Sequence, residues 1–376
     1  MMKFRSAGLS LLGLLLLPLG CGPSSAGDQD EGSAESALKR KHSRDSGTTM
    51  DSGSSDSVST DTGASTDTGV STDSGAATDG SASADSAPTT TGPSLGGCAM
   101  FPADSPWNTR IDSLPVSPRA AQYRANMAPT THLHADWGNW STDGYGIPWQ
   151  TVPATQSLVP ISFDYADESD LGPYPIPSSP LIEGHGTGDA HMLLLQMGTC
   201  VLYEVYAASR SSSGWHGGSG AKFNLSSNAL RPDGWTSADA AGLPILPGLV
   251  RYDEVMSGEI AHAIRFTVSR TQNAFIHPAT HGASTLTDPS YPPMGLRLRL
   301  RASFDTSKLA GPALVIVTAM KRYGIILADN GSNWYITGDS TDQWTSTLMS
   351  QVATAFSSVT GGDFEAVDTG PVIQQH

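Results

Sequence analysis

Four side chains that could take part in acid–base chemistry fall on one predicted β-hairpin. Residues 188–206 form two stretches rich in aliphatic and aromatic residues, joined by a two-residue turn at Gly198-Thr199. That turn sets Leu195 opposite Leu202, Leu193 opposite Glu204 and His191 opposite Tyr206. Because side chains alternate between the two faces of a strand, one face carries Asp189, His191, Glu204 and Tyr206, with neighbours roughly 5 to 8 Å apart. We predict these four as catalytic residues.

Two carboxylates, an imidazole and a phenol suit chemistry on a polysaccharide. Hydrolysis of a glycosidic bond needs two carboxylates held a defined distance apart, and one face of a sheet can supply them. In this interpretation Asp189 and Glu204 are the carboxylates, His191 is a base or an orienting group, and Tyr206 is a donor. The sequence thus favours a glycan-active enzyme, a hydrolase or a lyase.

Five further residues are predicted to bind substrate. Trp235 and Asp239 lie in the segment 230–244, which fits no regular element, and long irregular loops in compact domains are usually functional or mobile. His262 and Arg265 point to opposite faces of an expected strand, 262–268, which we pair with 249–255. Asp329 opens an expected tight turn, 329–331, of a hairpin that continues at 334–336. A core histidine and a turn aspartate are the structural alternatives for His262 and Asp329.

Two alternative functions remain open. His132, His134 and Asp136 are spaced by two residues, so an extended chain puts all three on one side, as a metal-dependent hydrolase would need. Four aromatic residues lie close by among glycines: Trp137, Trp140, Tyr145 and Trp149. They suit the sugar-stacking surface of a non-catalytic binding or adhesion protein, or they pack as a small satellite core. The predicted site itself includes no metal ligand, and the sequence identifies no cofactor.

The first 97 residues predict export and a membrane anchor. Residues 1–20 have a basic start and an apolar run, as in a secretory signal peptide. Leu17 to Cys21 resemble the lipobox of bacterial lipoproteins, so we predict Cys21 as the lipidation site and anchoring to the outer membrane or surface of a Gram-negative cell. Residues 21–97 are rich in Ser, Thr, Asp and Gly and include a six-residue repeat, which is typical of a disordered tether.

Composition limits the partners. The chain of 376 residues carries a net charge of −15, which argues against nucleic acid as a partner.

After Cys21 the two remaining cysteines are Cys98 and Cys200, and an exported chain most simply pairs them in a disulfide. The Walker A, H-E-x-x-H and paired CxxC motifs are absent from the sequence. Membrane lipid and polysaccharide are therefore the expected partners.

Residues 98–376 predict a single β-rich domain. Short strands dominate and no βαβ alternation is visible, so we expect an antiparallel, jelly-roll-like β-sandwich. Two peripheral helices are expected at 312–323, which starts with a proline and precedes Gly324, and at 341–357, which has an apolar stripe.

Five short segments resemble an uncharacterised family of secreted bacterial proteins and lipoproteins. They are YGIP at 145–148, GDAH at 188–191, GWTSADAAGLP at 234–244, PPMG at 292–295 and ADNG at 328–331. The resemblance implies one intact extracellular domain over residues 101–368. It implies no activity and no catalytic residue.

Overall fold

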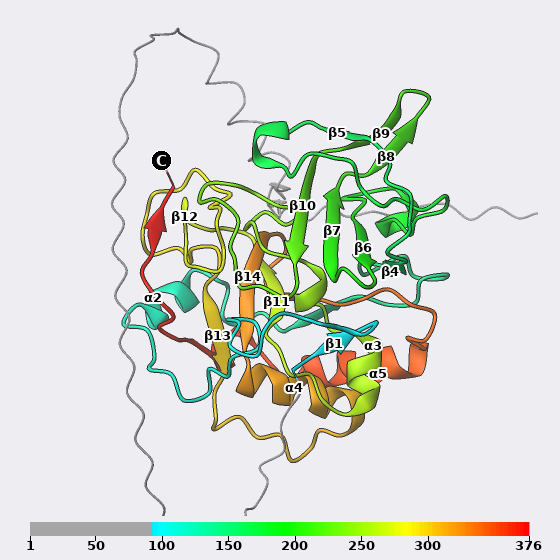
Figure 1. Ribbon diagram of the computed structural model, residues 1–376. Helices are drawn as coiled ribbons and strands as arrows, with labels where there is room; N and C mark the ends of the chain where they lie inside the picture. Colours follow the sequence, from blue (N-terminus) through cyan, green and yellow to red (C-terminus); the bar gives the residue numbers. More distant parts are fainter. Residues whose placement is uncertain (1–91, 376) are drawn as a thin grey trace, which may run out of the picture. The chain divides into compact units, whose positions relative to one another are not determined.

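The computed structural model describes residues 92–375 and shows a mainly β protein with several sheets and few helices (Figure 1). Cys21, the predicted signal peptide and most of the predicted tether lie outside these residues. The described helices are α2 (Ala120–Ala125), α3 (Tyr252–Ser257), α4 (Gly311–Arg322) and α5 (Ser346–Phe356). Within residues 92–375, none of the helices combines the length and the apolar character needed to cross a bilayer.

The predicted central hairpin is present with the expected register. It forms β6 (Met192–Gln196) and β7 (Val201–Tyr206), in which Leu193 faces Glu204 and Leu195 faces Leu202. The pair lies inside a four-stranded sheet between β10 (Ser219–Asn224) and β4 (Trp149–Val152), in the order β10-β7-β6-β4 (Figure 1). Both faces of this sheet are buried: Leu193, Leu195 and Leu202 join one core cluster, and Met192, Leu194 and Val205 join another.

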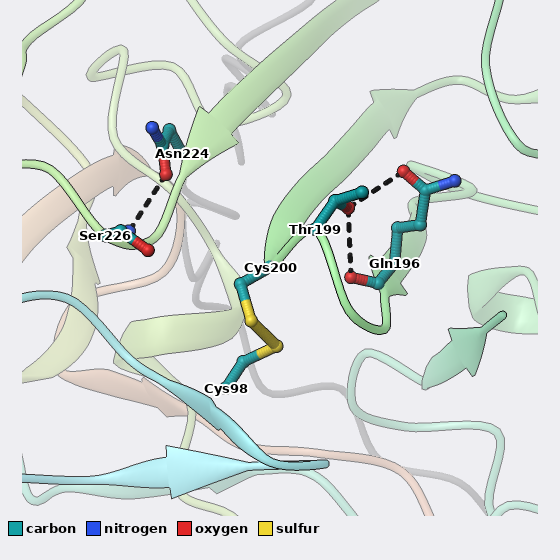
Figure 2. Close-up of a disulfide and its surroundings, with 6 residues drawn as sticks. All are labelled: Cys98, Gln196, Thr199, Cys200, Asn224 and Ser226. Atoms are coloured by element: carbon teal, nitrogen blue, oxygen red, sulfur yellow. Dashed lines mark hydrogen bonds between the residues drawn. A yellow bond between two sulfur atoms is a disulfide. The ribbon is translucent and has the colours of Figure 1, made fainter. Parts of the chain in front are cut away.

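The predicted disulfide joins Cys98 to Cys200, with Cα atoms 5.4 Å apart (Figure 2). Cys98 belongs to a short hairpin of β1 (Ser94–Leu95) and β2 (Cys98–Ala99). Cys200 ends the turn between β6 and β7, where the Thr199 hydroxyl donates to the Gln196 backbone and side-chain oxygens at 3.3 and 2.9 Å. The bond therefore ties the start of the described chain to the central hairpin.

A second, six-stranded sheet differs from the prediction. Its order is β16 (Phe364–Ala366), β13 (Arg297–Leu300), β14 (Ile325–Asn330), β11 (Ile264–Val268), β15 (Tyr335–Thr337) and β3 (His134–Asp136). The β11–β14 and β15–β3 pairs are parallel, as is β4–β6 in the other sheet, so these sheets are mixed rather than antiparallel. The expected hairpin of 325–328 with 334–336 is wrong, because β11 lies between β14 and β15 and pairs with both.

The helix α4 lies in the connection between the antiparallel strands β13 and β14. It begins at Gly311 with Pro312 in its first turn, and it packs against β13 and α5 before the chain enters β14 (Figure 1). Gly324 ends the connection with φ 73°, and a Cβ there would lie 2.3 Å from the Leu298 carbonyl oxygen. The sequence predicted this helix correctly. The second predicted helix is present as α5 and is capped by the Thr345 hydroxyl.

The expected strand at 249–255 is also wrong, because residues 252–257 form α3. Asp253 and Glu254 lie in its first turn, where carboxylates favour a helix N-terminus. Gly258 ends it in the left-handed conformation. His262 consequently precedes β11 instead of lying on it.

Smaller elements complete the fold. They comprise the three-stranded sheet of β5 (Ile161–Phe163), β9 (Gly214–Gly217) and β8 (Ser209–Ser211), the pair β12 (Ala274–Phe275) and β17 (Ile373–Gln374), and the 3-10 helices η1 (Ala166–Glu168), η2 (Glu183–His185), η3 (Leu246–Gly248) and η4 (Gly361–Asp363). Of the predicted irregular loop 230–244, residues 236–244 are buried and belong to the interior, whereas residues 232–235 are exposed or half-buried.

Candidate functional site

Five of the predicted site residues line one recess: Asp189, His191, Tyr206, Asp239 and Asp329. Its volume is about 300 Å³ including the part open to solvent, and it is narrow enough to hold about one water molecule. His191 precedes β6 and Tyr206 ends β7, so their antiparallel pairing brings both to the end of the sheet away from the 198–199 turn. Asp329 arrives from β14 of the other large sheet. The recess is therefore built where elements of the two sheets meet.

His191 is held as a cation. Its Nδ1 donates to Glu183 Oε2, and its Nε2 donates to the Ala238 carbonyl oxygen at 3.1 Å. Burial by itself lowers the pKa of an imidazole, but the Glu183 carboxylate outweighs burial and raises the pKa of His191 to about 9. With an acceptor at each ring nitrogen, His191 suits the orienting role and not the role of a base.

Asp239 is a buried carboxylate with one oxygen engaged. Its Oδ1 accepts a hydrogen bond from the Arg265 guanidinium at 3.0 Å, whereas Oδ2 is buried and has no hydrogen-bond partner among the described residues. Burial raises the pKa of Asp239, and the charge of Arg265 opposes that effect. A buried acceptor without a protein partner needs a water molecule or a ligand group to complete its hydrogen bonding.

Asp329 differs from Asp239 in its surroundings. One of its oxygens accepts the Asn330 backbone N–H at 2.6 Å. Burial and the nearby negative charge of Asp239 raise the pKa of Asp329 to about 7. Arg265 donates a hydrogen bond to Asp239 and thereby stabilises the ionised form of that carboxylate. When Asp239 and Asp329 hold one proton between them, we therefore expect it to reside on Asp329.

Local hydrogen bonds fix the segment that carries Asp239. The Ser237 hydroxyl accepts the Asp239 backbone N–H at 2.9 Å and donates to the Leu243 carbonyl at 2.6 Å. Gly242 adopts φ 74°, and a Cβ there would lie 2.1 Å from the Thr280 hydroxyl, so the turn requires glycine. The Asp239 side chain is thus set by its own segment before any ligand arrives.

Glu204 does not reach the recess, so the predicted pair of Asp189 with Glu204 does not form. Its carboxylate has no exposed surface and accepts the backbone N–H groups of Ile245 and Leu246, at 2.9 to 3.0 Å. Burial raises the pKa of Glu204 to about 7. The face alternation was predicted correctly, but the 236–250 segment covers that part of the face. Asp189, in contrast, is exposed at the recess.

Three predicted substrate-binding residues lie outside the lining. Trp235 is half-buried and its ring lies beside Arg231. His262 is buried and bonds Glu254 Oε2 at 2.9 Å and the Ala263 carbonyl at 2.8 Å, which is the structural alternative. Arg265 is buried behind the recess and acts on it through Asp239.

The sequence did not identify Glu183 as part of the site. Glu183 precedes His191 by eight residues across the glycine-rich 184–188 stretch, and no strand periodicity relates the two. The weak signal available was an acid close to a hairpin histidine.

The histidines considered as metal ligands are not gathered into a site. His134 stacks on Tyr335 with ring centroids 4.0 Å apart, and His132 is exposed, its backbone forming a β-bridge with Thr360. Within residues 92–375, no group of three or more His, Cys, Asp or Glu side chains is arranged to hold a metal ion.

Three of the five short segments singled out in the sequence meet at the recess. GDAH contributes Asp189 and His191, GWTSADAAGLP contributes Asp239, and ADNG contributes Asp329. Comparison with known proteins adds nothing to this picture, since no protein-family model, no curated protein and no solved structure matches this chain.

Proposed function

We propose that this protein is a surface-anchored polysaccharide hydrolase whose acid and base are Asp329 and Asp239. The observation that carries the proposal is one narrow recess lined by two carboxylates in unequal surroundings, one beside a guanidinium and one with a pKa near 7. Environments that separate the protonation states of two carboxylates are what acid–base hydrolysis of a glycoside requires.

The proposed reaction uses the water-sized space at Asp239. The Asp239 carboxylate takes a proton from a water molecule, and the resulting hydroxide attacks the anomeric carbon. As the glycosidic C–O bond breaks, Asp329 gives its proton to the leaving oxygen. Imidazolium His191 and Arg265 compensate the negative charge of the site without exchanging protons near neutral pH.

Charge favours hydrolysis over elimination by a lyase. Asp189, Asp239 and Asp329 line the recess, and Glu183 lies directly behind His191. His191 and Arg265 pair with Glu183 and Asp239, and Asp329 carries a proton in this mechanism, which leaves the exposed Asp189 carboxylate. A lyase acts on a uronate, whose carboxylate would be repelled by Asp189, whereas an uncharged sugar would not.

The test is to incubate the soluble domain with a panel of neutral and uronate polysaccharides. We expect new reducing ends without the ultraviolet absorbance of unsaturated uronates, and at least a hundredfold loss in Asp329→Asn and Asp239→Asn. Asp233→Asn, which removes an exposed carboxylate that pairs with His277, is the matched control. No reducing ends on any polymer, or full activity in both recess variants, would contradict the proposal.

A non-catalytic carbohydrate-binding protein is the second candidate. It is favoured by a wider cleft lined by Trp140, Trp149 and Tyr252, apart from the recess. In that case the soluble domain binds a polymer of the panel and releases no reducing ends.

We further propose export and lipid anchoring at Cys21, supported by the lipobox-like sequence and by the disulfide, which fits an oxidising compartment. Incorporation of labelled palmitate that disappears in Cys21→Ala tests the anchor.

We also propose that the two larger sheets pack as in a sandwich. This is supported by one core cluster that takes Leu195 from one sheet and Phe266 from the other.

A further inference from the structure

A second concave site, which shares no lining residue with the recess, is wider. It is lined by the half-buried aromatic rings of Trp140, Trp149 and Tyr252 and by the segment that begins at Asp339, and its volume is about 650 Å³ including the part open to solvent. We call it the aromatic cleft.

One buried carboxylate anchors two of the three aromatic residues that line the cleft, Trp149 through its ring and Tyr252 through its backbone. Asp339 accepts the indole N–H of Trp149 at 3.2 Å, the indole N–H of Trp344 at 2.8 Å and the backbone N–H of Tyr252 at 3.1 Å. Tyr252 also packs edge-on against Trp344, with ring centroids 5.3 Å apart. Rings fixed before binding lose little entropy on binding, so this arrangement is a preorganised surface for a flat, partly apolar ligand.

Ser340 also lines the cleft. Its hydroxyl, among the described residues, is buried without a hydrogen-bond partner. Buried hydroxyls in proteins are nearly always paired, so this one points to a ligand that brings its own hydrogen-bonding group. A sugar ring offers both an apolar face for the aromatic rings and hydroxyls for Ser340.

The charge of the cleft selects among sugars. Asp253, Asp339 and Asp342 are among its lining residues, and in the described part of the chain no lysine or arginine lines it. A polyuronate or a sulfated chain would meet like charges there. The cleft therefore suits an uncharged saccharide.

The 3-10 helix η2 connects the cleft to the recess. At one end Glu183 bonds His191 of the recess, and at the other end the His185 ring lies 4.1 Å from the ring of Trp140 in the cleft. A chain bound on Trp140 therefore lies next to the segment that positions His191.

We propose that the aromatic cleft is a binding subsite for an uncharged polysaccharide and delivers that chain to the Asp239–Asp329 recess. The delivery step rests on the proposed hydrolase function, whereas the binding step does not. Trp140 and Ser340 are thus specificity-determining residues outside the reacting centre.

The experiment measures binding and turnover separately. The soluble domain is titrated calorimetrically with cellohexaose, mannohexaose, xylohexaose and a hexameric oligogalacturonate. We expect at least one neutral hexasaccharide to bind, the oligogalacturonate to bind at least tenfold more weakly, and Trp140→Ala to weaken neutral binding at least tenfold. Ser340→Ala, the milder variant, should weaken it several-fold.

Controls distinguish the two proposals. Tyr291→Ala, which removes an aromatic ring that packs on Arg270 away from both sites, should bind as the wild type does. Asp329→Asn should also bind normally. Neutral binding that is lost in Trp140→Ala, in a protein without turnover, supports the cleft and refutes the hydrolase. Turnover with unchanged binding and KM in a folded Trp140→Ala protein refutes the cleft, as does preferred binding of the oligogalacturonate or no binding at all.

Discussion

Replacement of Glu183 by Gln should remove a pH-dependent part of the stability of the fold. The carboxylate of Glu183 raises the pKa of His191 from 6.5 to about 9 against the opposing effect of burial. At about 1.4 kcal/mol for each tenfold change in proton affinity, this corresponds to about 3 kcal/mol of preferential stabilisation of the imidazolium in the folded state.

The direction of the pH dependence follows from the raised pKa. A group that binds its proton more tightly in the folded state stabilises the fold fully below its unfolded pKa, here 6.5, and this stabilisation is lost as the pH rises through about 9. In Glu183→Gln the imidazole keeps its burial but loses the carboxylate, so it should be neutral near pH 7. The variant should therefore be less stable than the wild type by about 3 kcal/mol at about pH 6 and by little at about pH 10.

Urea unfolding between about pH 6 and pH 10 measures the difference in stability between the variant and the wild type. The imidazole proton resonance of His191, which is assigned because it is missing from a His191→Gln protein, reports the pKa of His191 directly. Asp164→Asn is the control, because it removes the carboxylate of an exposed pair with His216, 3.0 Å apart, and should cost less than about 1 kcal/mol. An equal penalty for Glu183→Gln at both ends of the pH range would refute the reasoning. So would a His191 resonance that titrates at or below pH 6.5 in the wild type.

Three other outcomes are expected. Replacing both Cys98 and Cys200 by Ser should lower the free energy of unfolding by about 4 to 5 kcal/mol, because the disulfide closes a loop with a sequence separation of 102 residues. Chemical denaturation measures this loss, and an unchanged unfolding midpoint would contradict the prediction. Glu204→Ala should cost about 2 to 6 kcal/mol, since it leaves two buried backbone N–H groups unpaired, while the folded fraction keeps its hydrolytic activity. Loss of that activity with unchanged stability would instead return Glu204 to the catalytic site. Hydrolysis by the wild type should decline as the pH rises through about 7, where Asp329 loses its proton, and a pH–rate profile that stays flat through this range would argue against Asp329 as the acid.

Local patterns in the sequence determined the central hairpin, the helices α4 and α5 and the disulfide. A two-residue turn fixes the register of a hairpin, so the facing of Leu193 with Glu204 followed from Gly198 and Thr199 alone. Likewise, a proline in the first turn and a glycine after the last one delimit α4. The pairing of Cys98 with Cys200 was predicted only from the two cysteines that remain after Cys21 in a chain expected to be exported.

Tertiary structure decided which of these residues share a site. Periodicity says which face of a sheet a side chain lies on, but not what covers that face, and so Glu204 became a partner for the backbone of 245–246 instead of an active-site acid. The strand β11 lies between β14 and β15 and pairs in parallel with β14, so β14 and β15 do not form the hairpin that their sequence suggested. Asp329 at the end of β14 then lines the recess. The approach of Asp239 to Asp329 and of Glu183 to His191 depends on packing between segments that no local pattern relates, and their protonation depends on that packing as well.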